Sequence, residues 1–174
     1  MLIQTGIPSP DEIKETLPSP ERLEQGPAAI FECFQNIPCN PCVDACPQGA
    51  ISIGDDINNR PVLDESKCNG CGICLAHCPG LSIFVVDYSY SPNEALLKLP
   101  YEYLPLPLPG QQVSALNRKG QAIATAQVKR VQQNKNKTTV LWIVVPKNLA
   151  MDIRGIATPK EGKHYDRTSN YLSL

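Results

Sequence analysis

Several features that identify common enzyme classes are missing from this sequence of 174 residues. It has only two histidines, and no histidine–carboxylate pair or activated nucleophile can be placed, so no catalytic site is predicted. It has no P-loop and no glycine-rich dinucleotide fingerprint, which argues against a flavin or nicotinamide site in this chain. We therefore expect any substrate chemistry to take place on another polypeptide.

Long hydrophobic runs are missing as well. The longest, from Val140 to Val145, is far shorter than the roughly 20 residues that a membrane-spanning helix needs. Residues 1–6 include no basic region and no long apolar stretch, so no signal peptide is expected. These absences predict a cytoplasmic protein without a membrane span.

The sequence does contain eight cysteines, which fall into two runs. The first run comprises Cys33, Cys39, Cys42 and Cys46, and the second comprises Cys68, Cys71, Cys74 and Cys78. A proline follows the last cysteine of each run. Three cysteines at three-residue intervals let a tight loop bind an iron–sulfur cluster, and the second run is similar to the one that bacterial ferredoxins use. We therefore expect two 4Fe-4S clusters and one-electron transfer in a reducing, anaerobic cytoplasm.

A repeat of 32 residues relates the two runs. It places Cys39, Cys42, Cys46 and Ile51 on Cys71, Cys74, Cys78 and Ile83. The position that matches Cys68 is Asn36, and Cys33 lies three residues earlier. We interpret Cys33 as a ligand that a longer loop brings to the first cluster. The alternative is that Cys33 is an ordinary buried cysteine, which leaves a 3Fe-4S cluster, or Asn36 or water at the fourth corner.

Other interpretations of the cysteines are weaker. Zinc sites combine Cys-x-x-Cys with histidines or a second such pair, usually without the cysteine–proline element. A disulfide framework needs an oxidising compartment. The last cysteine of each run is expected to open a short helix, with Pro47 or Pro79 in its first turn.

On these residues, the segment 28–90 resembles a two-cluster bacterial-type ferredoxin. The resemblance implies that the first three cysteines of each run share a cluster with the last cysteine of the other run. Cluster 1 would then be bound by Cys33, Cys39, Cys42 and Cys78. Cluster 2 would be bound by Cys68, Cys71, Cys74 and Cys46. Strands expected at residues 28–34, 50–53, 61–63 and 82–88 would form two pseudo-symmetric hairpins.

A second resemblance rests on residues 37–47 and on the order of the segments. It is to the small iron–sulfur subunits of FAD-dependent amine or amino-acid dehydrogenase complexes, such as those for proline, hydroxyproline or sarcosine. This resemblance implies flavin-containing dehydrogenase subunits as partners and a hetero-oligomer.

Two proline-containing segments flank the cysteines. Residues 1–27 are predicted to be a partner-binding arm, in which Ser9 and Ser19 cap short helices and Glu12 completes a capping box with Ser9. Residues 91–110 are predicted to be a proline-rich linker. Its leucines at 104, 106 and 108 alternate with prolines, which favours an extended strap in an apolar groove over a flexible spacer.

Residues 111–157 have the pattern of β-strands, expected at 112–117, 123–131, 138–145 and 152–157, with one helical turn at 148–151. Four strands in so short a segment predict a small antiparallel domain. The predicted fold class is therefore α+β, a pseudo-symmetric two-cluster ferredoxin fold followed by a small antiparallel β-barrel-like domain. Trp142 has apolar neighbours and is assigned to the core, and so no nucleic-acid interface is predicted. Residues 158–174 are expected to be a tail that orders against a partner.

Charge is unevenly distributed along the chain. Residues 1–90 have a balance of −8 and residues 91–174 a balance of +7, which suits an acidic electron carrier with a basic face for a partner subunit. Free carriers are little more than residues 28–90, whereas this chain is much longer. The favoured function is therefore an electron-transfer subunit of a multi-subunit flavin-dependent oxidoreductase. A free soluble ferredoxin and a nucleic-acid-binding iron–sulfur protein are the alternatives.

Overall fold

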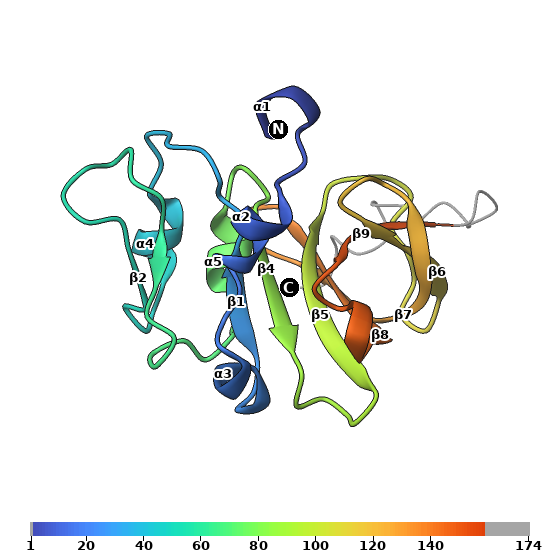
Figure 1. The fold of residues 1–174 in the computed structure, drawn as a ribbon. Coiled ribbons are helices and arrows are strands. Elements are labelled where there is room, and N and C mark those ends of the chain that lie inside the picture. Colours follow the sequence, from blue (N-terminus) through green and yellow to red (C-terminus); the bar gives the residue numbers. More distant parts are fainter. Residues whose placement is uncertain (1, 159–174) are drawn as a thin grey trace.

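The computed structural model describes residues 2–158 of the chain (Figure 1). Within this range, seven strands form one antiparallel sheet in the order β1-β4-β5-β8-β7-β6-β9. They are Ala28–Phe31 (β1), Ile83–Asp87 (β4), Glu94–Tyr101 (β5), Gln112–Asn117 (β6), Ala122–Gln133 (β7), Thr139–Pro146 (β8) and Ile153–Ala157 (β9). A smaller sheet pairs Ile51–Ser52 (β2) with Val62–Leu63 (β3). The predicted tail lies outside the described residues, apart from residue 158.

All helices in the described range are short. They are Leu2–Thr5 (α1), Pro10–Lys14 (α2), Pro20–Glu24 (α3), Pro41–Ala45 (α4) and Ile73–His77 (α5), with a 3-10 turn at Lys147–Leu149 (η1). None of these helices has the length and apolar character needed to cross a membrane.

The predicted caps of α2 and α3 are confirmed. The Glu12 N–H donates to Ser9 Oγ at 3.3 Å, while the Glu12 carboxylate accepts from the Ser9 N–H at 2.6 Å. Ser19 caps α3 through the N–H of Arg22. Helices this short need a surface to persist. For α3, the buried guanidinium of Arg22 makes this contact, because it donates to the carbonyls of residues 26, 27, 65 and 68.

The internal repeat is visible in the backbone. Helices α4 and α5 begin 32 residues apart, as do β2 and β4. Gly49 and Leu81, which the repeat aligns, both adopt left-handed backbone with φ of 56° and 53°. Their N–H groups donate to the carbonyls of Cys46 and Cys78, each at 3.2 Å. Leu81 therefore keeps the turn of its glycine counterpart, although a Cβ disfavours this conformation.

The predicted position of the two helices is wrong. Cys46 and Cys78 do not open α4 and α5 but follow them as C-caps, and Pro47 and Pro79 come after the helix ends. The first turn of α4 contains Pro41 instead. Proline suits both places, because it lacks the N–H that the first turn leaves unbonded and it cannot continue a helix.

The predicted boundary between a linker and a separate β-barrel is also corrected. Residues 94–101 form β5, which lies between β4 and β8, so one sheet runs from the cysteine-bearing half into the C-terminal half. The sheet is not a closed barrel, because β1 and β9 are its edges. Burial of alternate side chains, Ala95, Leu97 and Leu99, explains the strand despite Pro100. The strands predicted beyond residue 111 are confirmed as β6 to β9.

The predicted leucine strap is not formed. Leu106 is buried in the core, but Leu104 and Leu108 are 61% and 45% exposed. A bend at residues 104–105 and a turn at 109–110 interrupt the extended backbone, so alternate side chains do not stay on one face.

The large sheet separates two hydrophobic cores. On one face, Leu97 and Leu99 pack with residues of β6 to β9, including Val128 and Ile153. On the other face, Val85 of β4 and Val140 of β8 pack with the buried side chains of α4 and α5. Side chains alternate between faces along a strand, so Lys98 of β5 points to this second face. The cysteine-bearing loops therefore lie against β4, β5 and β8.

Salt bridges tie the two edges of the sheet together. Glu32, which directly follows β1, accepts hydrogen bonds from Arg154 Nε of β9 at 2.6 Å and from Arg118 Nε, after β6, at 3.0 Å. The three side chains, here called the Glu32 cluster, are nearly buried, with exposures of 9%, 5% and 10%. The sheet is thus curled, and charged side chains rather than strand pairing join its edges.

Candidate iron–sulfur centres

The cysteine thiols lie in two groups, and the first group contains cysteines from both runs. Cys33 follows β1, Cys39 precedes α4, Cys42 lies within α4, and Cys78 caps α5. Burial raises the pKa of Cys33, and the nearby Cys78 and Cys39 raise it further. Burial and the same two neighbours raise the pKa of Cys42 to about 11. Cys78 of the second run therefore lies near cysteines of the first run.

The second group is the counterpart of the first. Cys46, Cys68, Cys71 and Cys74 line one small cavity, whose other walls include Ala29, Ile51 and Leu63. Burial raises the pKa of Cys74 to about 12, followed by the effects of Cys68, Cys71 and Cys46. Helices α4 and α5 pack against one another, so the last cysteine of each run reaches toward the other group.

The geometry does not suit a single metal ion. Among residues 2–158, no three histidine, cysteine or acidic side chains converge closely enough to bind one ion. A cubane is a larger group that takes one thiolate on each of its four irons. Since burial raises the pKa values of Cys33, Cys42 and Cys74, metal binding has to displace the protons of these thiols.

Backbone N–H groups complete the surroundings of the sulfurs. The N–H groups of Ala50 and Ser82, which the repeat aligns, donate to Cys46 Sγ and Cys78 Sγ, each at 3.4 Å. The Gly70 N–H donates to Cys68 Sγ at 3.4 Å. Hydrogen bonds of this kind stabilise negative charge on cluster ligands and tune the potential. Four soft thiols with amide donors in each group fit a 4Fe-4S cluster.

Replacing Gly70 by alanine is expected to destabilise the second loop strongly. Gly70 has a φ of 62°, and an added Cβ would lie 2.5 Å from the backbone of Pro27. Gly120→Ala is the matched control, because Gly120 has a φ of 74° but open space around it. We expect the control to cost about 1–2 kcal/mol from backbone strain alone, and Gly70→Ala to cost more and to reduce iron retention. Urea unfolding and iron analysis of both variants provide the measurement, and equal losses would contradict the role of the Pro27 contact.

Asn36, the alternative to Cys33, has another partner. Its side-chain oxygen accepts a hydrogen bond from Arg60 Nε at 3.3 Å in an exposed position. Cys33 in contrast lies within electrostatic range of two thiols of its group.

Lys98 was missed from the sequence, because residue 98 was assigned to a linker. Its side chain is buried, and Nζ donates to the carbonyls of Gly70 at 2.8 Å and Cys71 at 3.4 Å. The same Nζ lies 4.3 Å from the centre of the Trp142 ring. Trp142 is partly buried against the core that contains the cysteines, but Lys98 and Arg130 lie over its ring, so the prediction of apolar neighbours alone is corrected. The sequence signal for Lys98 is a single cation among the apolar residues 95–101.

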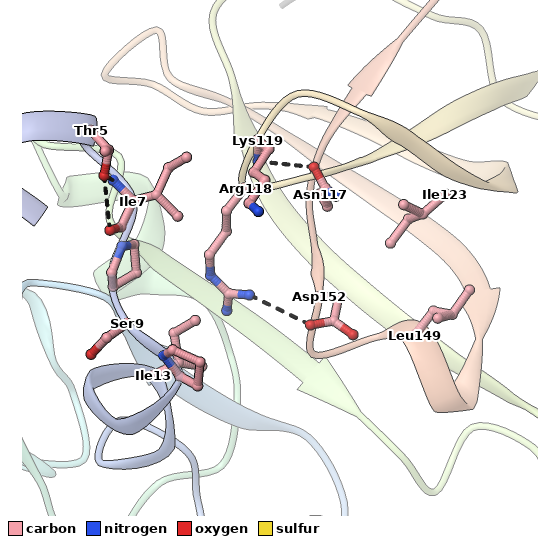
Figure 2. Close-up of a pocket in the computed structure, with 12 residues that line it drawn as sticks. Thr5, Ile7, Ser9, Ile13, Asn117, Arg118, Lys119, Ile123, Leu149 and Asp152 are labelled. Atoms are coloured by element: carbon pink, nitrogen blue, oxygen red, sulfur yellow. Dashed lines mark hydrogen bonds and ion pairs between the residues drawn. The ribbon is translucent and has the colours of Figure 1, made fainter. Parts of the chain in front are cut away.

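A separate hollow of about 670 Å³ lies between the N-terminal arm and the far end of the sheet. Figure 2 shows Ile7 and Ile13 of the arm on one side, Ile123 and Leu149 on the other, and the ion pair of Arg118 with Asp152. No cysteine lines this hollow, so it is not part of the candidate centres.

Comparison with known proteins supports the assignment of the cysteine region. The family of 4Fe-4S dicluster domains matches residues 37–80. The polyferredoxin-like subunit of an aliphatic sulfonate oxidoreductase from Pyrococcus furiosus is 40% identical over 60 residues, covering 29% of this chain and 34% of that protein. Subunit I of the F(420)H(2) dehydrogenase of Methanosarcina mazei is 30% identical over 91 residues, covering 49% and 51%. The ferredoxin-type protein NapF of Escherichia coli is 33% identical over 60 residues, covering 33% and 36%.

The similarity thus spans between a third and about half of the length of these relatives. No solved structure matches the chain significantly. The spacing of the cysteines, the repeated helices and the family match agree with one another. Residues 37–80 therefore match a ferredoxin-type 4Fe-4S dicluster domain, and this part of the chain is similar to iron–sulfur proteins.

Proposed function

We propose that this chain binds two 4Fe-4S clusters and relays single electrons within a flavin-dependent oxidoreductase complex. The observation that carries the proposal is that the last cysteine of each run lies near thiols of the other run. In this arrangement Cys33, Cys39, Cys42 and Cys78 bind cluster 1, and Cys46, Cys68, Cys71 and Cys74 bind cluster 2. The proximity of Cys78 to Cys33 and Cys42, and of Cys46 to Cys74, supports these two sets.

The protein supplies the positions and surroundings of the clusters, while the bound clusters supply the one-electron chemistry. Each exchanged cysteine follows a helix that packs on its counterpart, which favours two neighbouring clusters. Buried aliphatic residues such as Leu75 and Ile51 pack with the buried Cys42 and Cys74. The amides of Ala50, Gly70 and Ser82 offset negative charge at the sulfurs. Two adjacent clusters suit a relay that receives an electron at one and releases it from the other.

The partner is inferred from what the chain lacks and from its relatives. Two similar proteins are named as subunits, one of an oxidoreductase and one of a dehydrogenase. No flavin or nicotinamide fingerprint occurs in the sequence, so the flavin belongs to another subunit in this proposal. An amino acid such as proline is the substrate implied by the resemblance of residues 37–47.

Anaerobic purification of the tagged chain from its native cells tests the assignment to a complex. We expect additional polypeptides and bound flavin to co-elute in constant proportion through affinity and size-exclusion steps. Reduction of the clusters by the substrate of the co-eluting dehydrogenase, followed by electron paramagnetic resonance, would support the relay. A flavin-free monomer that exchanges electrons with unrelated reductases would favour the free ferredoxin instead.

A further inference from the structure

Lys98 is a buried cation beside the second group of thiols. Only 7% of the residue is exposed, and its ammonium group donates to the carbonyls of Gly70 and Cys71 in the second loop. Its aliphatic Cδ would lie 3.6 Å from a Cβ added to Gly72 of the same loop. Strand β5 thus places a positive charge directly behind the loop that carries Cys68, Cys71 and Cys74.

This charge has no direct counter-ion in the described part of the chain. No acidic side chain among residues 2–158 forms a salt bridge with Lys98, although Asp87 lies within electrostatic range. Two carbonyl oxygens and the Trp142 ring are its direct contacts. An unpaired buried charge is costly, by several kcal/mol in proteins generally. The fold therefore retains a cation here that the packing of β5 alone does not require.

We propose that Lys98 is the counter-charge of cluster 2 and raises its reduction potential. The inference rests on the proposed ligand set of Cys46, Cys68, Cys71 and Cys74. Four thiolates outweigh the positive charge of the cubane, so the bound cluster is an anion, and an added electron makes it more negative. A fixed cation in a low-dielectric site stabilises the reduced form more than the oxidised form.

Cluster 1 lacks an equivalent buried cation in the described residues. Arg60 is the cation that acts on Cys33, and it is exposed, so water and salt screen its charge. The two centres are therefore related by the repeat in their ligands but not in their electrostatic surroundings. Lys98, together with the buried Arg22 that donates to the Cys68 carbonyl at 2.6 Å, makes cluster 2 the preferred position for the electron.

Redox titration of the full-length, cluster-loaded protein followed by electron paramagnetic resonance tests this role. The variants are Lys98→Met, which removes the charge at similar length, and Lys98→Arg, which keeps it. Lys129→Met is the control for net charge, because Lys129 is an exposed residue of β7. Cys78→Ala protein, in which only cluster 2 is expected to remain, identifies the signal of cluster 2.

In Lys98→Met we expect the ratio of reduced to oxidised cluster 2 at a fixed potential to fall about tenfold, equivalent to about 59 mV for one electron. Cluster 1 should stay unchanged, and the Lys98→Arg and Lys129→Met variants should titrate like the wild type. If Lys98→Met loses cluster 2 while Lys98→Arg retains it, the requirement for the charge is supported as well.

Three results would overturn the inference. The first is a Lys98→Met protein with both clusters and an unchanged potential for cluster 2. The second is the loss of cluster 2 in both Lys98→Met and Lys98→Arg, which would assign Lys98 a packing role. The third is a wild-type protein without two clusters, which would overturn the proposed function together with this inference, and iron analysis separates that case from the first two.

Discussion

Replacing Cys78 by alanine is expected to remove cluster 1, although Cys78 belongs to the second run of cysteines. The wild-type chain should contain about eight iron and eight sulfide, and the variant about four of each, by the stoichiometry of two cubanes. The reason is that the proposed ligand set joins Cys78 to the first run, and Cys78 lies near Cys33 and Cys42. Anaerobic iron and sulfide analysis with electron paramagnetic resonance provides the measurement. Cys46→Ala should show the reverse, with loss of cluster 2.

Cys33→Ala separates the two interpretations of the first run. If Cys33 is a ligand, its removal should lower the iron content and change the resonance signal of cluster 1. If the wild type contains about seven iron and Cys33→Ala changes nothing, the 3Fe-4S alternative is correct. A Cys78→Ala protein that loses the cluster of its own run would contradict the exchange of ligands.

Replacing Glu32 by glutamine is expected to cause the largest loss of stability outside the cysteines. The change leaves the guanidinium groups of Arg118 and Arg154 buried with no carboxylate between them. Removing one partner of a buried ion pair costs about 3–5 kcal/mol. For a domain of this size each kcal/mol lowers the melting temperature by about 2–4 °C. Thermal unfolding of the cluster-loaded protein under anaerobic conditions checks the prediction.

Lys67→Met is the matched control for an exposed ion pair. Lys67 contacts Asp64 at 2.8 Å, with both side chains about half exposed, and exposed pairs contribute about 0–1 kcal/mol. Similar losses in the two variants would show that the Glu32 cluster stabilises the fold no more than an exposed ion pair does.

The Glu32 cluster should also contribute less to stability in acid. Burial alone would raise the pKa of Glu32, but the hydrogen bonds and charges of Arg118 and Arg154 outweigh burial and lower it.

Because that pKa is lowered in the folded state, the contribution of Glu32 is fully present above its unfolded value of about 4.3. It is lost as the pH falls through the folded pKa. The difference in stability between wild type and Glu32→Gln should therefore be constant near neutral pH and shrink below about pH 4.

Local patterns in the sequence were sufficient for much of this structure. The 32-residue repeat predicted two related halves with one short helix each, because ligand spacing restricts the intervening backbone, although both helices begin earlier than expected. Serine followed by proline predicted the starts of α2 and α3, since capping depends on residues within one turn. Apolar alternation predicted β6 to β9. Cysteine spacing identified the candidate ligands.

Features that depend on distant residues were not predicted. Prolines suggested a linker at 91–110, but pairing of β5 with both β4 and β8 outweighs the donor that Pro100 lacks. Because residues 91–110 were assigned to a linker, Lys98 was not recognised, and its proposed role depends on contacts with residues nearly 30 positions earlier. It also led to a separate barrel instead of one curled sheet. The Glu32 cluster joins residues 86 and 122 positions apart, a distance at which no local pattern exists.

The continuous sheet sets a limit on how this protein can be divided. A fragment cut at residues 37 and 80 would keep seven of the eight cysteines but lose Cys33 and both strands, β1 and β4, on which α5 rests. Without β1 and β4, the apolar side chains of α5 in this fragment would face water. Excision or transplantation of the cluster-binding region should therefore follow the strands rather than the family match. A unit that extends through β5 and β8 is the smallest that keeps Lys98 and Trp142 in place.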